Sequence, residues 1–429
     1  MRPGDSLDLT IEKGVYRGLG LARADGQVVF VARGLPGDRL RARIVAEERG
    51  YLRAEPEALL TPGPERRASP CPFVPRCGGC SYQELDYAAQ LRMKEAILRE
   101  SLARSGAPWD GEIPLVASPE VAWRMRATFH VSARDDALRV GLREEGSHRV
   151  VDLGHCLQLS QPMNQVVAGF REALSARPGL AARVEDLLLA EALDDGAIVA
   201  CLEGELGAGD STALLALGDG LGLAALGAMV GPPRHRRYLP LRGEPYLVST
   251  VLGVRLRAHV RSFFQVNRFL VEALARQVRE WTPPSGTLVD LYAGVGLFAL
   301  TLAGQAERVL GIESSSLAVE DATANAAAAG FQHARFREGD VLRALASWNV
   351  AADERVVLDP PRSGAGGEVV AAVARRRPAN VVYVSCDPTT LGRDLKTFRE
   401  SGYRPTAMAG FDLFPDTFHM ETVVRLQPA

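Results

Sequence analysis

The chain has 429 residues, of which 47% are hydrophobic, and its formal net charge is −2. That length accommodates about two or three domains with ordinary apolar cores. No apolar run approaches the roughly 18 residues of a membrane span, and the N-terminus has no signal-peptide pattern, so we expect a soluble, cytoplasmic protein. The near-neutral charge by itself does not indicate a nucleic-acid partner.

Residues 6–57 alternate apolar and polar positions, and glycines mark the turns between them. This period of two predicts about four or five short strands, with Ala24-Asp25-Gly26 as a hairpin turn. Short strands at this spacing are typical of a small β-barrel of the oligonucleotide-binding (OB) kind. We therefore predict an OB-like barrel in residues 1–60.

A cluster of cysteines follows the barrel, in a segment that reads CPFVPRCGGC and contains Cys71, Cys77 and Cys80. In a cytosolic chain a tight cluster is more typical of metal binding than of disulfide bonding. Thiolates suit either an iron–sulfur cluster or zinc. The spacing differs from the paired C-x-x-C motifs that are typical of zinc ribbons.

The middle of the chain has a mixed pattern. Residues 86–105 have helical periodicity without a breaker, whereas 123–133, 137–145 and 148–156 resemble strands. We therefore predict an α+β central domain in residues 61–260, with its first helix able to pack on the domain that follows.

After Ser262, strand-like and helix-like segments alternate regularly to the end of the chain. Alternation with this spacing predicts a doubly wound, mostly parallel sheet, an α/β fold of the Rossmann-like kind. We assign residues 261–429 to this domain.

The first strand of this domain runs into a turn that contains Tyr292, Gly294 and Gly296. Glycines let the backbone turn tightly and approach a ligand at the carboxyl edge of the sheet. The next strand ends in Glu313, at a position where a carboxylate typically binds ribose hydroxyls, and Asp340 follows the strand after that. The lack of a third glycine disfavours NAD and favours S-adenosylmethionine (AdoMet).

Three reactive groups lie near the ends of later strands: Asp359 in DPPR, Cys386 in VSCDP and Glu421 in FHME. A thiol with a neighbouring carboxylate can attack an electrophilic carbon and then remove a proton. Cys386 precedes a helix, and we expect the N-terminus of that helix to lower the pKa of the thiol. His419 is as consistent with a structural role as with a functional one.

The motifs DPPRSG, VVYVSCDPTTL and FPDTFHME together resemble the signature of the RNA uridine-5-methyltransferase family, which makes 5-methyluridine in tRNA and 23S rRNA. FFQVN at 263–267 resembles the segment that opens the catalytic domain of that family, and residues 6–57 resemble its TRAM module. The cysteine segment together with Cys156 is similar to the iron–sulfur branch, most of all to its 23S rRNA methyltransferases.

This resemblance implies a class I AdoMet methyltransferase domain in which Cys386 adds to C6 of uracil and Glu421 removes the proton from C5. The target base has to be flipped out or already unpaired. The resemblance and the glycine turn assign cofactor binding to Gln265, Tyr292, Gly294, Gly296, Glu313, Asp340 and Asp359. The resemblance assigns a [4Fe–4S] cluster, with zinc as the alternative, to Cys71, Cys77, Cys80 and Cys156.

Three positions near these motifs depart from the family pattern. Leu297 and Asp387 stand where many relatives carry Asn, and Asp416 stands where Gln is common. None of them removes the nucleophile, the base or a ribose-binding acid, so we expect changes in affinity rather than loss of activity.

The favoured substrate is 23S rRNA, because the rRNA-modifying members combine the TRAM and iron–sulfur features. Uridine 54 of tRNA stays open, since archaeal-type tRNA members share them. A non-catalytic RNA-binding factor is less favoured because both Cys386 and Glu421 are present. An amino-group methyltransferase is also less favoured, because DPPR ends in Arg362 rather than an aromatic residue. We expect a monomer.

Candidate RNA contacts are basic and aromatic residues that can meet phosphates and splayed bases. They are Tyr16, Arg17 and Arg39 in the barrel, and Arg124, Arg126, Arg234, His235, Arg236, Arg237, Tyr238 and Arg242 in the central domain.

Overall fold

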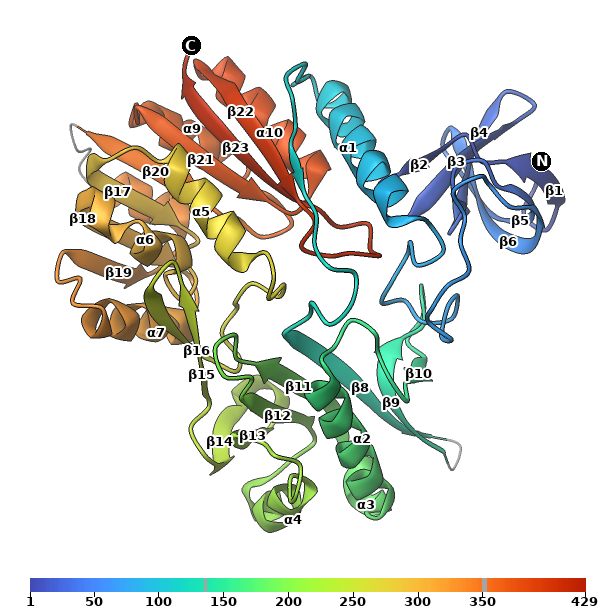
Figure 1. The fold of residues 1–429 in the computed structure, drawn as a ribbon, viewed down its shortest axis with the longest axis horizontal. Helices are drawn as coiled ribbons and strands as arrows, with labels where there is room; N and C mark the ends of the chain where they lie inside the picture. Colours follow the sequence, from blue (N-terminus) through green and yellow to red (C-terminus); the bar gives the residue numbers. More distant parts are fainter. Residues whose placement is uncertain (135–136, 349–352) are drawn as a thin grey trace.

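The computed structural model describes residues 1–134, 137–348 and 353–429. Figure 1 shows an N-terminal β unit, a central sheet and a C-terminal α/β unit grouped around the middle of the molecule. No helix in the described ranges is long and apolar enough to cross a membrane.

The N-terminal unit is a six-stranded sheet in the order β1-β5-β6-β4-β3-β2. Its strands are β1 (Ser6–Thr10), β2 (Lys13–Val15), β3 (Leu19–Ala24), β4 (Gln27–Ala32), β5 (Arg39–Glu48) and β6 (Tyr51–Thr61). The sequence pattern predicts only about four or five strands, because β2 is three residues long and too short to show an alternation of apolar and polar positions. The predicted hairpin is confirmed, since Asp25 and Gly26 have positive φ (46° and 79°) between the paired strands β3 and β4.

Helix α1 (Tyr87–Arg104) packs on the C-terminal unit (Figure 1), and strand β7 (Leu115–Val116) joins its sheet. Leu98 of α1 lies in the same apolar core as Leu391 of α10 (Pro388–Glu400). Strand β7 pairs with β22 (Tyr403–Phe411) at the edge of the C-terminal sheet. In space both elements therefore belong with the C-terminal unit, although the sequence pattern groups them with residues 61–260.

The central sheet has seven strands in the order β10-β9-β8-β11-β12-β13-β14. Its elements are β8 (Arg126–Arg134), β9 (Ala137–Arg143), β10 (Val150–Asp152), α2 (Gln161–Ser175), α3 (Pro178–Ala181), β11 (Val184–Glu191), β12 (Ile198–Gly204), α4 (Ser211–Leu217), β13 (Ala225–Val230) and β14 (Arg237–Arg242). Phe170 of α2 packs with Phe129 and Leu187 of the sheet in one apolar core. The two-stranded hairpin of β15 (Tyr246–Val251) and β16 (Val254–His259) connects this sheet to the C-terminal unit.

The C-terminal sheet has eight strands in the order β19-β18-β17-β20-β21-β23-β22-β7. Its remaining elements are α5 (Val271–Trp281), β17 (Ser285–Leu291), α6 (Leu297–Thr301), β18 (Ala306–Glu313), α7 (Ser316–Ala328), β19 (Ala334–Glu338), α8 (Val341–Ser347), β20 (Glu354–Leu358), α9 (Gly367–Arg375), β21 (Asn380–Ser385) and β23 (Glu421–Pro428). Strands β17 to β21 are parallel, which confirms the predicted doubly wound sheet.

Strand β23 runs antiparallel to β21. The carboxyl ends of the parallel strands therefore meet the amino end of β23 at one edge of the sheet. Ligands of open α/β sheets bind outside this edge.

Candidate active site

The pairing of β21 with β23 brings the predicted nucleophile and base together. Ser385 is the register partner of Thr422. Cys386 follows Ser385 and Glu421 precedes Thr422, so in this antiparallel pair both residues come directly after the last pair at the same end of the two strands. Asp359 follows the neighbouring parallel strand β20 at the same edge. Electrostatic coupling of Cys386 to both carboxylates is consistent with this proximity.

The environment of Cys386 differs from the one that its position before a helix predicts. Burial, together with the charges of Glu421 and Asp359, raises the pKa of the thiol to about 12. Arg362 lowers it, and Asp387 raises it by less than Arg362 lowers it. The expectation of a lowered pKa is therefore wrong for the protein without substrate, because burial and the nearby anions outweigh the helix N-terminus.

Asp387 occupies the helix N-terminus that was expected to act on the thiol. One carboxylate oxygen accepts hydrogen bonds from the backbone N–H groups of Thr389 (2.9 Å) and Thr390 (3.0 Å), which caps α10. The other oxygen accepts a hydrogen bond from the hydroxyl of Tyr16, at 2.8 Å, which extends from the N-terminal unit. Tyr16 is therefore a contact between two units rather than a free surface residue.

Replacing Asp387 with Asn should make Cys386 more reactive near neutral pH. Asn keeps a capping oxygen for α10 but removes one of the negative charges that raise the thiol pKa. Because only the thiolate reacts, the alkylation rate of Cys386 should rise with pH in both proteins, and the profile of Asp387→Asn should lie at lower pH. Mass spectrometry of the Cys386 peptide after alkylation measures this, and coincident profiles would contradict it.

Glu421 is buried, with 4% of its surface exposed, and among the described residues its Oε1 has no hydrogen-bond partner. Burial and the nearby Asp359 raise its pKa well above the ordinary value, while Arg362 lowers it. A carboxyl group with an unused buried oxygen beside a thiol is suited to accept a proton from a bound molecule. His419 is half-buried, its ring centroid lies 4.1 Å from that of Phe418, and burial lowers its pKa to about 3. A neutral, packed imidazole favours the structural alternative for His419.

The predicted cofactor turn has the strained backbone that its glycines indicate. Tyr292, Gly294 and Gly296 all have positive φ, at 66°, 52° and 88°. The N–H of Gly294 donates to the Glu313 carboxylate at 3.0 Å, so the turn and the predicted ribose-binding acid lie together. No atom lies within 4 Å of the place that a Gly294 side chain would occupy, which leaves the backbone open to a ligand.

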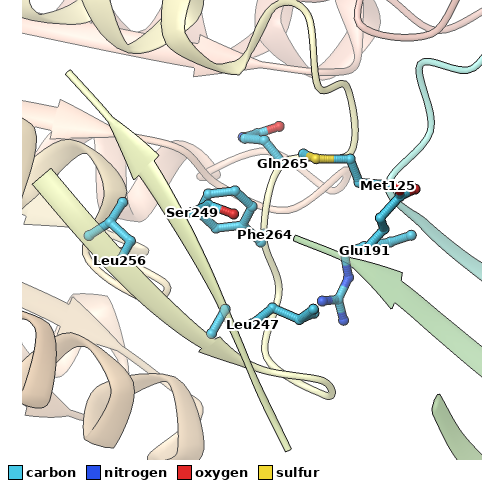
Figure 2. Close-up of a pocket in the computed structure, with 9 residues that line it drawn as sticks. Met125, Glu191, Leu247, Ser249, Leu256, Phe264 and Gln265 are labelled. Carbon is cyan, nitrogen blue, oxygen red and sulfur yellow. The ribbon is translucent and has the colours of Figure 1, made fainter. Parts of the chain in front are cut away.

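The other predicted cofactor residues differ in their exposure to solvent and in their hydrogen-bond partners. Asp340 is exposed and caps α8 by accepting a hydrogen bond from the N–H of Arg343 at 3.0 Å. The amide of Gln265 donates to Asp359 at 3.5 Å, and burial raises the pKa of Asp359 to about 7, with a further contribution from Glu313. Figure 2 shows Gln265 beside Met125 and Phe264 at a small cavity between the central and C-terminal units.

Asp290 is a site residue that sequence reasoning missed. It is the only carboxylate within the apolar strand Leu288–Leu291, which was the available signal. Its Oδ2 accepts a hydrogen bond from the N–H of Ala299 at 2.8 Å, whereas Oδ1 has no partner within the described ranges. Burial raises the pKa of Asp290 to about 8, and Asp359 and Glu313 contribute to that increase. Asp290 precedes Tyr292 by two residues, and its hydrogen bond to Ala299 connects the end of β17 to helix α6 across the cofactor turn.

The raised pKa of Asp290 predicts a pH-dependent stability. Between the ordinary carboxyl pKa and about 8, the folded protein holds a proton that the unfolded chain releases, so the contribution of Asp290 to the free energy of unfolding falls as pH rises. Asp290→Asn should remove this loss and be more stable than the parent at pH 8, by roughly 1–3 kcal/mol. Urea unfolding at pH 5 and pH 8 measures the difference, and equal pH dependence in both proteins would contradict it.

The four cysteines predicted as ligands line one cavity, together with Val74, Leu142 and Leu153. None of them is in a disulfide. N–H groups point at two of the sulfurs: the backbone of Gly79 donates to Cys77 at 3.4 Å, and the amides of Gln158 and Gln83 donate to Cys80 at 3.5 and 3.8 Å. In the part of the chain that the structure describes, no three His, Cys, Asp or Glu side chains are grouped tightly enough to hold a metal ion. Cys201, by contrast, is fully buried in the apolar core.

Asp416 connects this cavity to the segment that precedes Glu421. Its carboxylate accepts hydrogen bonds from the amides of Gln83 (2.8 Å), Gln158 (3.0 Å) and Gln90 (3.0 Å). Arg67 adds a longer contact at 3.4 Å. Asp416 thus joins residues 67–90 and Gln158 to the C-terminal unit. Leu297, another departure from the family pattern, is 7% exposed and packs in the apolar core.

Most of the predicted RNA contacts have structural partners. Arg126 donates to the carbonyl of Val260 at 2.5 Å, and Arg124 lies over the Trp123 ring at 4.8 Å. The remaining pairs are Arg39 with Asp8, Arg236 with Glu185, Arg242 with Asp219 and the ring of Tyr238 with His259. Arg17, Arg234, His235 and Arg237 are exposed.

Residues 86–428 match the family model described as tRNA (Uracil-5-)-methyltransferase, and residues 2–56 match the TRAM domain. An uncharacterized RNA methyltransferase of Thermosynechococcus vestitus is 32% identical, over 99% of this chain and 98% of its own length. The 23S rRNA (uracil(1939)-C(5))-methyltransferase of Pseudomonas aeruginosa is 34% identical, over 99% of this chain and 94% of its own.

Among solved structures, the chain resembles the Pyrococcus abyssi tRNA (uracil-54, C5)-methyltransferase in complex with S-adenosyl-L-homocysteine. The TM-score is 0.77, the sequence identity is 24%, and the match covers 98% of this chain and 99% of the other. At that identity the likeness establishes a shared fold.

Proposed function

Because the chain belongs to the tRNA (Uracil-5-)-methyltransferase family and carries a TRAM domain, it is an RNA uracil-5-methyltransferase, and we propose that it acts through covalent addition of Cys386 to the base. The observation that carries this mechanism is the antiparallel register of β21 and β23, whose last pair, Ser385 and Thr422, directly adjoins Cys386 and Glu421. Both residues lie at the sheet edge that holds the glycine turn.

The chemistry needs these two groups because C5 of uracil is a weak nucleophile. The sulfur of Cys386 forms a bond to C6, and the electron pair of the C5=C6 double bond moves into an enolate. C5 then forms its bond to the methyl group, which AdoMet supplies when bound. Glu421 takes the proton from C5, the double bond re-forms, and Cys386 leaves as a thiolate.

The raised pKa of Cys386 means that the thiol must lose its proton before the sulfur can add to C6. A strongly basic sulfur forms a good bond to carbon but is largely protonated before substrate enters. Arg362 is exposed beside the thiol and lowers its pKa. We infer that the thiol gives its proton to Asp359 when the uracil displaces water, because Glu421 has to stay free to take the proton from C5.

We assign the binding site for AdoMet, the methyl donor, to the residues around the glycine turn. Gly294 leaves the backbone open, Glu313 accepts a hydrogen bond from the N–H of Gly294, and Asp290 has a carboxylate oxygen without a partner among the described residues. We propose that Gln265 and Asp359, which contact each other, bind the methionine end and the uracil edge. Tyr292 and Asp340 complete the proposed set.

A 23S rRNA target is the preferred substrate. It is supported by the rRNA methyltransferase of Pseudomonas aeruginosa, which is similar over nearly the whole of both chains. Uridine 54 of tRNA is the second candidate, favoured by the shared fold with the Pyrococcus abyssi enzyme. In both cases we propose the TRAM domain and the central sheet as the RNA-binding parts.

For the four cysteines we propose a [4Fe–4S] cluster rather than zinc. They surround a cavity instead of converging on one point, as a cluster of several atoms requires. N–H groups directed at Cys77 and Cys80 would stabilise thiolate ligands. Protein purified without oxygen should therefore contain iron and acid-labile sulfide in equal amounts, both lost in Cys77→Ser. Zinc without sulfide would overturn this assignment.

The experiment that tests the proposed function is trapping with RNA that contains 5-fluorouridine. A fluorine at C5 cannot be removed as a proton, so the enzyme should stall in a covalent adduct after methyl transfer when AdoMet is present. Digesting the adduct maps the nucleotide and separates rRNA from tRNA. If neither RNA forms an adduct while the protein binds both RNA and AdoMet, the covalent mechanism is wrong.

A further inference from the structure

The central unit has a large polar groove that the proposed reaction does not use. It has a volume of about 1220 Å³ and is lined by β8, β9, β10, α3, β11 and the cysteine segment. Its arginines are Arg76, Arg139, Arg143, Arg149 and Arg183, and its acids are Glu144, Glu185, Asp186 and Glu205. We call it the β8–β10 groove.

The acids of this groove are mostly engaged by partners. Asp186 lies 2.5 Å from the ring of His130 and Glu185 lies 3.4 Å from Arg236. Glu144 accepts a hydrogen bond from the hydroxyl of Ser147 at 3.3 Å. Arg236 neutralises the charge of Glu185, His130 does so for Asp186 when it is protonated, and the serine hydroxyl leaves the charge of Glu144 unchanged.

The arginines at one end of the groove are free by comparison. Arg76, Arg143 and Arg149 are exposed, and none has an acidic partner among the residues that the structure describes. Arg183, in contrast, is held by both oxygens of Asp210 at 2.8 Å. The uncompensated charge of the groove is therefore positive, and it is carried by guanidinium groups, which suit phosphate oxygens.

The backbone brings these arginines together and connects them to the rest of the enzyme. Arg143 pairs in register with Val150, the residue after Arg149. The N–H of Gly78 donates to the carbonyl of Arg143 at 3.0 Å, which joins the cysteine segment to β9. Arg33 of the TRAM domain pairs with Glu145 at 2.6 Å beside this junction. The groove thus adjoins both the cysteine cavity and the TRAM domain.

We propose that the β8–β10 groove binds the phosphate backbone of the substrate RNA outside the segment that enters the active site. The inference rests on the proposed function, because it names a binding surface for the same substrate. Contacts to phosphate fix the position of an RNA without reading its sequence. The groove would therefore contribute affinity and salt dependence rather than choice of uridine.

The test is a triple variant, Arg76→Ala/Arg143→Ala/Arg149→Ala, assayed on the transcript that forms the 5-fluorouridine adduct. Three lost phosphate contacts should reduce the slope of log K against log salt by about two and weaken binding on the order of 100-fold at 0.1 M salt. KM should rise, while kcat at saturating RNA and AdoMet affinity should stay unchanged. The matched control removes three exposed arginines of the C-terminal unit, Arg104, Arg276 and Arg404.

An unchanged salt slope in the triple variant, with circular dichroism matching the parent, overturns the proposal. So does an equal loss in the control variant, because that would indicate a general charge effect. A triple variant that binds RNA normally but no longer binds an acidic protein from the same cell also overturns it. Failure of the proposed function is distinguishable, since the unaltered protein would then form no adduct at all.

Discussion

Replacing Cys386 with Ala should abolish both the 5-fluorouridine adduct and methyl transfer, with a loss on the order of 10⁴-fold or more in kcat. Without the sulfur no electron density is delivered to C5, and no other thiol lies at this edge of the sheet within the described residues: Cys201 is in the central core and the remaining four line their own cavity. The half-buried side chain is small, so the fold should be kept. Transfer of a labelled methyl group to RNA measures the effect.

Cys201→Ala is the matched control, because it removes a buried thiol far from the proposed chemistry. It should lose some stability from the cavity that it leaves but form the adduct normally. Full methylation by Cys386→Ala would contradict the covalent mechanism and favour the amino-group methyltransferase. Absence of activity in the unaltered protein, with RNA binding intact, would favour a non-catalytic RNA-binding factor.

Glu421→Gln should trap the enzyme on ordinary RNA after methyl transfer. The amide cannot accept the C5 proton, so the double bond cannot re-form and Cys386 cannot leave. Turnover should fall by about 10²–10⁴-fold. A covalent complex that carries the labelled methyl group should accumulate on RNA without fluorine. Denaturing gels, which retain only covalent complexes, measure it.

Glu421→Gln should also increase the rate of the first step, the addition of Cys386 to C6. The Glu421 charge raises the pKa of Cys386, so removing that charge should lower the pKa and speed addition to C6. Glu368→Gln on the surface of α9 is the control, and it should leave both steps unchanged. If Glu421→Gln loses activity but accumulates no complex, Glu421 acts before methyl transfer and another group is the base.

The raised pKa of Glu421 also predicts how the rate of the last step, in which Cys386 is released from the methylated base, depends on pH. Burial and Asp359 keep the carboxyl protonated to higher pH than usual, and only the ionised form can take the C5 proton. Release should therefore accelerate as pH rises, until the carboxyl is fully ionised. Asp359 raises the pKa of both Cys386 and Glu421.

Local patterns in the sequence were enough to predict the strands and the turn that carry most of the site residues. The alternation of short apolar segments with helix-like segments after Ser262 predicts the parallel sheet, because strands that are buried on both faces consist of short apolar runs. It also places Tyr292, Glu313 and Asp359 at strand ends, where parallel strands share an edge. The glycines of the turn at 292–296 predict its positive φ, because few other residues adopt that backbone without strain.

Electrostatic details of the site could not be predicted in this way. The pKa of Cys386 depends on which charges lie within a few ångströms, and Glu421 and Asp359 come from two other strands. A helix N-terminus after the thiol was visible in the sequence, but its occupation by Asp387 and Tyr16 was not. Asp290 was likewise hidden, since burial, the main cause of its raised pKa, belongs to the whole sheet, and the contributing Asp359 and Glu313 come from other parts of the chain.

The sequence by itself determined the order of strands and helices, the family motifs and the identity of the reactive groups, because these depend on neighbours within one turn or one strand. Only the tertiary structure decided that β23 runs antiparallel beside β21, that β7 pairs with β22 at the edge of the C-terminal sheet, and that Asp416 contacts Gln83, Gln90 and Gln158. The contact from Tyr16 to Asp387 spans 371 residues. Such contacts arise when whole units pack together, and no local pattern of side chains encodes which surfaces will meet.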